Sequence, residues 1–181
     1  MTDDEIEQAK VLFPNVGARM GDERPCLVRF YNLCDSPIDL FWLSPQKEPT
    51  KYGTLARRKY LDISTFQLHP WVALRAFDGF KLLINKQTVF WPHAPVPNVI
   101  YRQTCFITVP MKSLRELAAR AFVYQPSSVL NRLCPQLPRE VQYDMSVLRS
   151  VKDEYSQVVC RSIGPVRPSS EFVVLAPPRG Q

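Results

Sequence analysis

Residues 25–44 read PCLVRFYNLCDSPIDLFWLS, and this stretch decides the fold class. Two runs of aromatic and branched residues, Cys26–Leu33 and Ile38–Ser44, flank the turn signal Asp35-Ser36-Pro37. Runs of about 4–8 such residues that are bounded by turn residues are typical of β-strands. The stretch therefore predicts two short strands joined by a turn.

Similar runs of aromatic and branched residues continue along the chain as far as Pro110. Five further runs are Lys59–Gln67, Trp71–Phe77, Lys81–Asn85, Thr88–Trp91 and Thr104–Pro110. About seven short strands at this spacing indicate an antiparallel β-sandwich. We expect residues 24–110 to form this sandwich. Residues 1–23 are polar and poorly patterned, so they are predicted to be a disordered arm.

After Pro110 the apolar residues change to the period of a helix. Ser113 and Glu116 form a capping box, in which the serine hydroxyl accepts a hydrogen bond from the amide three residues on. An apolar stripe follows at helical spacing: Leu114, Leu117, Ala118, Ala121 and Phe122. Arg115, Glu116 and Arg120 are expected elsewhere on the surface of this helix.

Two more short helices are predicted before residue 150. Pro126 ends the first helix, and Ser127 or Ser128 can cap the second. Pro138 suits the first turn of the third. The apolar side of that helix carries Val141, Met145 and Leu148. Three helices in residues 111–150 cannot bury all their stripes among themselves, so we expect a partner protein to cover part of this module.

The fold class is thus predicted to be mainly β with a small α-helical part: an antiparallel sandwich of about seven strands followed by a three-helix module. The last segment, residues 151–181, contains Pro165, Pro168, Pro177 and Pro178. We expect it to be a mostly disordered, proline-rich tail that holds at most one more helical turn.

The composition restricts the kinds of partner. The chain has 23 basic and 17 acidic side chains, a net charge of +6, which favours acidic partners in general. It shows neither zinc-finger spacing nor an RNA-binding aromatic motif, so nucleic acid is not expected. The acidic N-terminus is unlike a signal peptide, and no apolar run reaches the ~18 residues of a membrane helix. We expect a protein of the cytoplasm and nucleus without membrane contact.

Catalysis has few candidate residues. His69 and His93 are the two histidines, and no Gly-rich phosphate loop or cluster of metal ligands is present. The five cysteines form no Cys-x-x-Cys pair, and Cys105 and Cys134 lie in apolar or proline-rich surroundings typical of packed thiols. We therefore expect a protein that is not an enzyme and that needs no metal or cofactor.

Large side chains with polar edges gather within about thirty residues. Phe41-Trp42-Leu43 is followed by Tyr52-Gly53-Thr54-Leu55, and then by Thr65, His69 and Trp71. Taken singly, the two tryptophans are typical core residues and the others are ordinary strand or turn residues. Taken together, two tryptophans, a tyrosine, a hydroxyl and an imidazole within one short segment form a joint pattern that the single residues do not indicate.

This segment resembles the peptide-binding region of the von Hippel-Lindau family, which has an aromatic strand, a Tyr-x-Thr-Leu element and a Ser/Thr-x-x-x-His-x-Trp element. The similarity covers roughly residues 25–150 and continues through the segments Leu82–Asn85, Phe90–Pro92 and Phe106–Pro110. The resemblance implies a 4-hydroxyproline pocket lined by Trp42, Tyr52, Thr65, His69 and Trp71. It also implies that the ligand is the prolyl-hydroxylated degron of the hypoxia-inducible factor alpha subunit.

Such a pocket can discriminate strongly. The Thr65 hydroxyl and the His69 imidazole can each hydrogen-bond the 4-hydroxyl, and unmodified proline would leave each unpaired at a cost of about 1–3 kcal/mol. An extended acidic ligand also suits strand addition at a sheet edge. The basic run Arg57-Arg58-Lys59 either attracts such a peptide or is a solvated loop.

The helical module carries two further resemblances to the same family. Ser113, Leu114 and Ala118 match its elongin-binding box, which implies that Leu114 enters a pocket on elongin C. Four later residues match its cullin box: Leu137, Pro138, Val141 and Met145. The implied partners are elongin C, elongin B and a cullin-2-type cullin with a RING subunit. By pattern alone, the first helix could equally pack inside the chain.

The resemblance therefore implies a substrate receptor of a cullin-RING ubiquitin ligase, which directs hydroxylated proteins to ubiquitination and proteasomal degradation in the hypoxia response. The alternative is a peptide-binding β-sandwich that acts as a scaffold without a ligase. The chain departs from the family pattern in five places: Leu61 and Asp62 stand where arginines are expected, Ser64 replaces a histidine, Thr65 a serine and Ala118 a cysteine.

Overall fold

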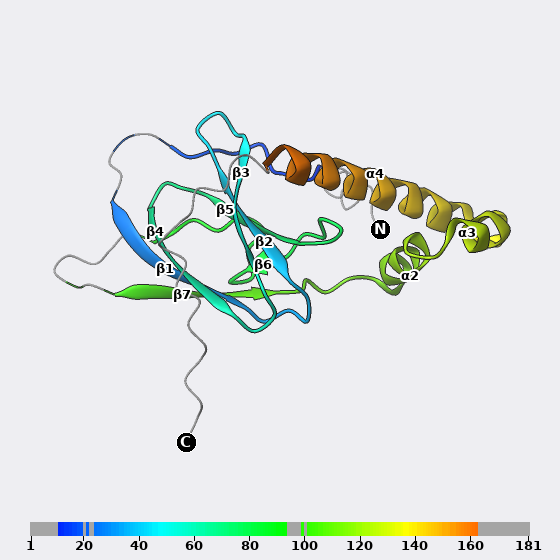
Figure 1. The fold of residues 1–181 in the computed structure, drawn as a ribbon, viewed down its shortest axis with the longest axis horizontal. Helices are drawn as coiled ribbons and strands as arrows, with labels where there is room; N and C mark the ends of the chain where they lie inside the picture. Colours follow the sequence, from blue (N-terminus) through cyan, green and yellow to red (C-terminus); the bar gives the residue numbers. More distant parts are fainter. Residues whose placement is uncertain (1–10, 20, 22–23, 94–98, 100, 163–181) are drawn as a thin grey trace, which may run out of the picture. The chain divides into compact units, whose positions relative to one another are not determined.

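The computed structural model describes residues 11–19, 21, 24–93, 99 and 101–162. The chain divides into two compact units. One consists mainly of Phe13–Pro110 and contains the strands, and the other consists mainly of Met111–Val158 and contains the helices (Figure 1). Each unit is described by itself.

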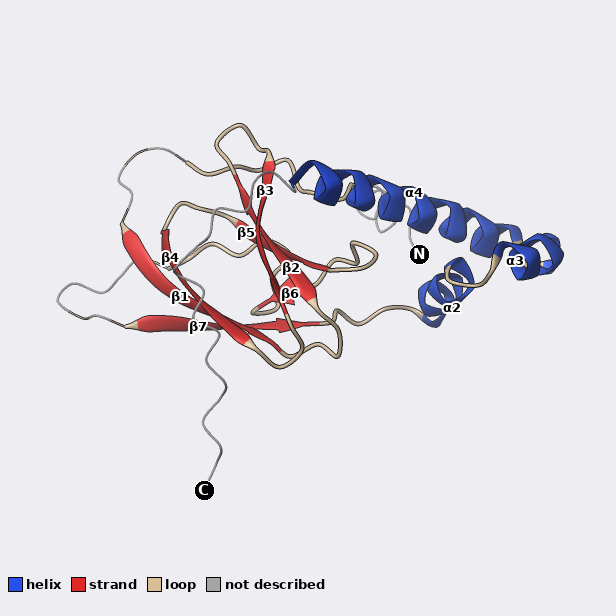
Figure 2. Ribbon diagram, in the orientation of Figure 1, coloured by secondary structure: helices blue, strands red, loops and turns tan. Residues whose placement is uncertain are grey.

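Two β-sheets form the first unit (Figure 2). The four-stranded sheet has the order β4-β1-β7-β6, and the three-stranded sheet has the order β3-β2-β5. The strands are β1 (Pro25–Asn32), β2 (Ile38–Leu43), β3 (Pro49–Leu55), β4 (Tyr60–Phe66), β5 (Trp71–Arg75), β6 (Leu83–Ile84) and β7 (Arg102–Thr108). Both sheets contribute to one hydrophobic core, so the prediction of two packed sheets followed by helices is confirmed.

The expectation of a purely antiparallel sandwich is wrong. Strands β1 and β7 are parallel neighbours, with Phe30 opposite Cys105. The other strand pairs are antiparallel. Alternation of apolar residues reports which side chains face the core but not the direction of the neighbouring strand, so the sequence pattern could not reveal this pairing.

Strand β3 was not predicted, and the run Thr88–Trp91 is not a strand. The sequence of β3, PTKYGTL, contains proline, lysine and glycine, because β3 is an edge strand with alternate side chains in solvent. In the run Thr88–Trp91, Phe90 alone bridges to Trp71, through backbone hydrogen bonds of 2.8 and 2.9 Å.

Part of the predicted N-terminal arm is ordered. The backbone amide of Ala18 donates to the carbonyl of Leu43 at 3.0 Å, and the Phe13 ring contacts Phe41 edge-on at 5.0 Å between centroids. A Cβ on Gly17 would lie 2.3 Å from the carbonyl oxygen of Ser44, so the close approach requires glycine. The expectation of disorder is therefore wrong for residues 13–19, which pack along the end of β2, while residues 1–10, 20, 22 and 23 lie outside the described part.

The second unit contains α2 (Leu114–Val123), α3 (Ser127–Leu133), a 3-10 turn (Cys134–Gln136) and most of α4 (Arg139–Ser162). Its core consists of Ala119, Leu130, Met145 and Leu148, with Phe122, Val123, Leu137 and Val141 packed around them. Among the described residues, no helix is both long and apolar enough to cross a membrane.

Helix α4 overturns two expectations. It has 24 residues, so the described chain holds about as much helix as strand and is a mixed α/β protein rather than a mainly β one. It also extends into the segment predicted to be a disordered tail. Residues 151–162 contain neither glycine nor proline, and the buried Val151 and Tyr155 continue the apolar stripe of Leu148 at helical spacing. The predicted tail from residue 163 onward lies outside the described residues.

Candidate functional site

The five residues predicted to line a pocket come from four strands and one loop of the β unit. Trp42 lies on β2, Tyr52 on β3, Thr65 on β4 and Trp71 at the start of β5, and His69 lies in the β4–β5 loop. Trp42 and Trp71 are direct partners in the antiparallel pair of β2 and β5. The structure therefore brings together two tryptophans that are far apart in sequence.

A bulge in β3 distinguishes Tyr52 from its neighbours. Leu40 pairs with Gly53 and Phe41 pairs with Lys51, so Tyr52 is the extra residue between two consecutive partners of β2. A bulge of this kind bends the strand and re-aims the side chain of the extra residue. The Tyr52 ring lies edge-on to Trp71 with centroids 5.3 Å apart, and it remains 38% exposed.

Thr65 is buried and bonded to Trp71. The indole Nε1 of Trp71 donates to the Thr65 hydroxyl oxygen at 3.1 Å. The hydroxyl accepts this bond, so its own O–H can still donate to another group. Thr65 and Trp71 are 4% and 2% exposed, and the bond between them is shielded from water.

His69 completes the cluster. Its ring stacks on Trp42 with centroids 5.3 Å apart and an interplanar angle of 29°. Phe66 approaches the same imidazole at 5.0 Å between centroids and is 37% exposed. Phe66 was not among the predicted site residues, although its place one residue after Thr65 in the same motif could have indicated it.

The indole nitrogen of Trp42 has no hydrogen-bond partner among the described residues, and the atom itself is buried. A buried N–H without an acceptor costs about 1–3 kcal/mol. Such orphan donors are uncommon in folded proteins, and a ligand that accepts from the donor would remove this cost. The cluster thus combines aromatic faces, a hydroxyl, an imidazole and an unsatisfied donor.

The departures from the family pattern on β4 do not all face this cluster. Successive side chains of a strand point to opposite faces, so Asp62 and Ser64 lie on the face of β4 opposite to Thr65. Asp62 binds Arg29 through both carboxylate oxygens, at 2.7 and 2.8 Å. Leu61 is 4% exposed and belongs to the core.

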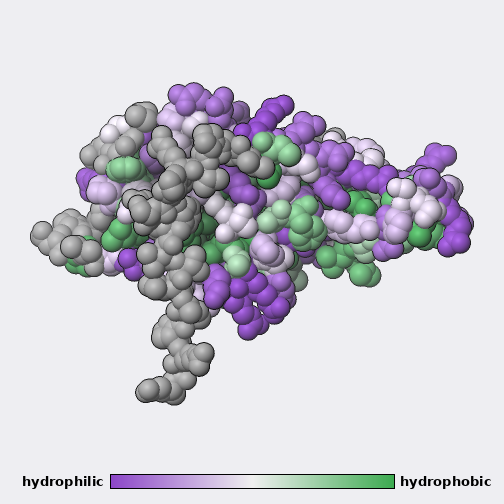
Figure 3. All heavy atoms as spheres, viewed as in Figure 1, coloured by the Kyte–Doolittle hydropathy of each residue, from purple (hydrophilic) through white to green (hydrophobic). Residues whose placement is uncertain are grey.

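The helical candidate site is an exposed apolar surface on α2. Met111, Leu114 and Leu117 are 100%, 83% and 51% exposed, and Ala121 is exposed as well. Figure 3 shows apolar residues gathered on the surface where Figure 1 places α2. The side of α2 that faces the interior is formed by Glu116 and Ala119 instead. Leu114, Leu117 and Ala121 of the predicted stripe are thus turned outward, Ala118 lies half-buried at the border, and Phe122 packs against the helical core.

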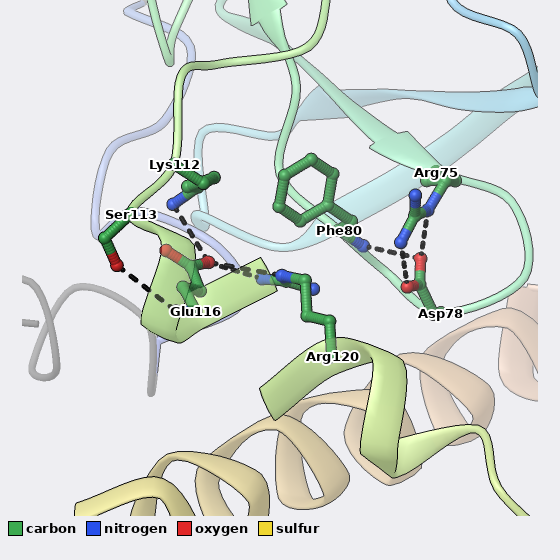
Figure 4. A network of polar contacts seen from close by, with 7 residues as sticks. All are labelled: Arg75, Asp78, Phe80, Lys112, Ser113, Glu116 and Arg120. Carbon is green, nitrogen blue, oxygen red and sulfur yellow. Dashed lines mark hydrogen bonds and ion pairs between the residues drawn. The ribbon is translucent and has the colours of Figure 1, made fainter. Parts of the chain in front are cut away.

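The expectation that Glu116 lies on the helix surface is wrong. Its carboxylate is bound by Lys112 at 3.2 Å and by Arg120 at 2.9 Å, which satisfies its charge although the residue is 4% exposed (Figure 4). The Glu116 amide donates to the Ser113 hydroxyl at 3.2 Å, so the predicted serine cap is confirmed. These contacts fix the first turn of α2, which carries Leu114.

The four residues predicted to bind a cullin have different surroundings. Met145 is 1% exposed and lies in the helical core, against which Leu137 and Val141 pack. Pro138 is exposed at the start of α4, next to Arg139 and Glu140, which are also exposed. Of the four, Pro138 is thus exposed, Leu137 and Val141 are half-buried, and Met145 is buried.

The described residues contain no group of three or more His, Cys, Asp or Glu side chains able to hold a metal ion. Burial raises the pKa of the Cys105 thiol to about 12, so this cysteine is protonated at neutral pH and is a poor nucleophile. Burial also raises the pKa of Cys26 and Cys34. No protein-family model matches the chain.

Proposed function

We propose that the chain is a non-catalytic substrate receptor of a cullin-RING ubiquitin ligase, of the von Hippel-Lindau type, that recognises 4-hydroxyproline in an extended peptide. The observation that carries the proposal is the convergence of Trp42, Tyr52, Thr65, His69 and Trp71 into one cluster linked by ring contacts and by the Trp71–Thr65 hydrogen bond.

The cluster has the chemistry that a hydroxylated prolyl ring requires. Aromatic faces bind a rigid ring at little entropic cost, and Trp42, Tyr52 and Trp71 supply them. The Thr65 O–H can donate to the ligand hydroxyl, and a neutral His69 can accept the hydroxyl hydrogen. Thr65 already accepts from Trp71 at 3.1 Å, which orients its hydroxyl before the ligand binds.

The position of Tyr52 supports an extended ligand. Strand β3 is an edge of the three-stranded sheet, so a peptide can approach it without displacing a strand, whereas the other edge, β5, is hydrogen-bonded to residues 80–90. Tyr52 stands on edge strand β3 at a bulge and is 38% exposed. The proposed ligand is the prolyl-hydroxylated degron of the hypoxia-inducible factor alpha subunit.

The proposed connection to the ligase is α2. Leu114 is 83% exposed and Met111 is fully exposed, although both are large apolar residues. Exposed apolar patches of this kind mark protein–protein contacts. We assign the surface made by Met111, Leu114, Leu117 and Ala118 to elongin C, with elongin B, a cullin-2-type cullin and a RING subunit as the further partners.

The proposed pocket is tested by measuring the affinities of a hydroxylated and an unhydroxylated degron peptide for the unaltered chain and for two variants. His69→Ala and Thr65→Ala are each expected to weaken binding of a hydroxylated degron peptide about tenfold or more, since each removes a partner of the 4-hydroxyl. Binding of the unhydroxylated peptide should change little. If both peptides lose affinity equally, the residues shape the surface without reading the hydroxyl group, and the proposal fails.

A further inference from the structure

The outer face of the four-stranded sheet carries an ordered pattern of its own. Residues that alternate away from the core form cross-strand rows over β4, β1 and β7. The first row is Ser64, Leu27 and Arg102; the second is Asp62, Arg29 and Thr104; and the third is Tyr60, Tyr31 and Phe106. We call this surface the outer face. Thr65 of the hydroxyproline cluster points to the opposite side of β4.

A cavity of about 240 Å³ opens at the first row. Leu27 and Ser64 of the outer face line it at the end of the sheet, together with Cys26 and Gln103, which alternate to the other face, and with Pro25, His93, Val99 and Tyr101. Its lining is mostly apolar. Since a cavity of about 150 Å³ holds a benzene ring, this one has room for a single branched or aromatic side chain.

The third row is aromatic, with Phe106 exposed, Tyr31 half-buried and Tyr60 buried. The Tyr31 ring lies 6.3 Å from Phe106 and 6.4 Å from Tyr60 between centroids. Phe106 is 47% exposed although it lies on a central strand of the sheet. Leu33, just beyond the end of β1, is 50% exposed. Leu27 and Tyr31 are four residues apart on β1, which places the cavity and the aromatic row about 13 Å apart along the strand.

The charge of the outer face is positive. Asp62 is the one acidic residue in the sequences of β1, β4, β6 and β7, and these strands carry Arg29 and Arg102. Arg29 engages both oxygens of Asp62. Arg102 reaches one of them at 3.3 Å with a side chain that is 44% exposed, so most of its donors still face solvent.

Basic residues also stand beside the aromatic row. Lys59 and Arg58 precede Tyr60, and Lys86 follows Asn85, whose side chain binds the amide of Phe106 at 2.8 Å. Within the described part of the chain, no ion pair is formed by these three residues. The outer face thus has Arg102 at one end, Arg29 in the middle and these three basic residues at the other end. Positive charge along an apolar surface favours an acidic, partly apolar partner.

We propose that the outer face is a second peptide-binding site, separate from the hydroxyproline cluster, for an extended acidic segment. One apolar side chain of the segment enters the cavity beside Leu27, and a neighbouring carboxylate binds Arg102. A second apolar side chain, about four residues away in an extended strand, rests on Phe106 and Tyr31. The occupant is a partner protein with alternating acidic and apolar residues.

The test uses two displayed libraries of peptides about ten residues long, a length that spans both anchors. One library combines Asp and Glu with Leu, Ile, Phe and Ser, and the other replaces Asp and Glu by Lys and Arg. Each is selected on the full chain, and selected peptides are measured by fluorescence anisotropy. Arg102→Gln and Phe106→Ser are the test variants. Arg149→Gln, at an exposed arginine on α4, is the charge-matched control.

We expect enrichment from the acidic library alone. Arg102→Gln and Phe106→Ser should each weaken the selected peptides at least tenfold, and Arg149→Gln should leave them unchanged. Hydroxylated degron peptide should bind all these proteins alike, which separates this proposal from that of the hydroxyproline cluster. Enrichment from neither library, or equal loss in Arg102→Gln and Arg149→Gln, would overturn it. Displacement of the selected peptides by single-stranded oligothymidylate, with tighter binding of the oligonucleotide, would make the surface a nucleic-acid site instead.

Discussion

At the scale of single residues, Thr65 has a structural contact and a proposed role in recognition. Its hydroxyl oxygen accepts the Trp71 indole N–H at 3.1 Å inside the protein. In the proposed function, its hydroxyl hydrogen is donated to the ligand. Serine would supply the same two functions, so the threonine keeps what the site needs and adds a buried methyl group. The residue is 4% exposed, and water cannot replace a lost bond there.

This dual role predicts different outcomes for two small substitutions. Thr65→Val keeps the shape but leaves the Trp71 indole N–H without an acceptor, so the free energy of unfolding should fall by about 1–3 kcal/mol. Thr65→Ser keeps the acceptor and should lose less. Urea denaturation measures both against the unaltered chain, and a Thr65→Val variant as stable as the unaltered chain would show that the indole bond contributes nothing.

The motif spacing of Trp42, Tyr52, Thr65, His69 and Trp71 predicted that they act together, and ring contacts and one hydrogen bond link them in the structure, while their binding of hydroxyproline stays a prediction. Burial of Glu116 could not be found that way. A glutamate at the third position of a capping box is ordinarily at the surface, and its burial depends on Lys112 and Arg120, which bind it from the preceding and following turns. The bulge at Tyr52 was equally hidden, since it depends on the pairing of β2 with β3.

At the scale of elements, α2 presents Leu114 and Leu117 outward and its paired Glu116 inward. The apolar period predicted the helix and its cap correctly, but it does not indicate which neighbour covers the stripe. An intrachain packing role for Leu114 is disfavoured by its 83% exposure. The apolar pattern is limited in the same way for the strands. Edge strand β3 has few apolar residues, and the apolar residues of β1 and β7 do not indicate that these two strands run parallel.

Because Leu114 is exposed on α2, a substitution of this residue can distinguish a ligase receptor from a scaffold. Leu114→Asp should abolish co-purification with elongins B and C, while the melting temperature of the chain alone changes little, since the side chain is already in solvent. Arg149→Asp, also at an exposed helical position, is the control and should retain the elongins. Retention by Leu114→Asp would favour a scaffold that acts without the ligase.

The outer face of the four-stranded sheet has a pH signature. Hydrogen bonds from Arg29, and then the charge of Arg102, hold the pKa of Asp62 below its usual range. At a given pH, the unfolded chain therefore binds a proton at Asp62 more readily than the folded chain does. The contribution of ionised Asp62 to the free energy of unfolding is complete above the ordinary pKa of about 3.9, and it is lost as the pH falls through the lower pKa of the folded state.

Asp62→Asn removes this titration. Between about pH 2 and pH 5, the free energy of unfolding of the variant should depend less steeply on pH than that of the unaltered chain. Urea denaturation across this range measures the two slopes. Identical slopes would mean that the Arg29–Asp62 contact does not persist in solution.

At the scale of the whole molecule, the division into a β unit and a helical unit suits a receptor that joins a substrate to an assembly. The β unit holds the aromatic cluster and the helical unit holds the exposed stripe, and each has its own hydrophobic core. Sequence patterns predicted both units because each has one dominant period. They underestimated the length of α4, because the apolar stripe in residues 151–162 is a weak signal next to the prolines that follow.

The measurement that tests the central claim most directly is the affinity of the chain, co-expressed with elongins B and C, for one degron peptide with and without the proline 4-hydroxyl. We predict a preference of a hundredfold or more for the hydroxylated peptide, which corresponds to about 2.7 kcal/mol. Equal affinity for the two peptides, or no binding of either, would contradict the assignment of the Trp42–Trp71 cluster as a reader of hydroxyproline.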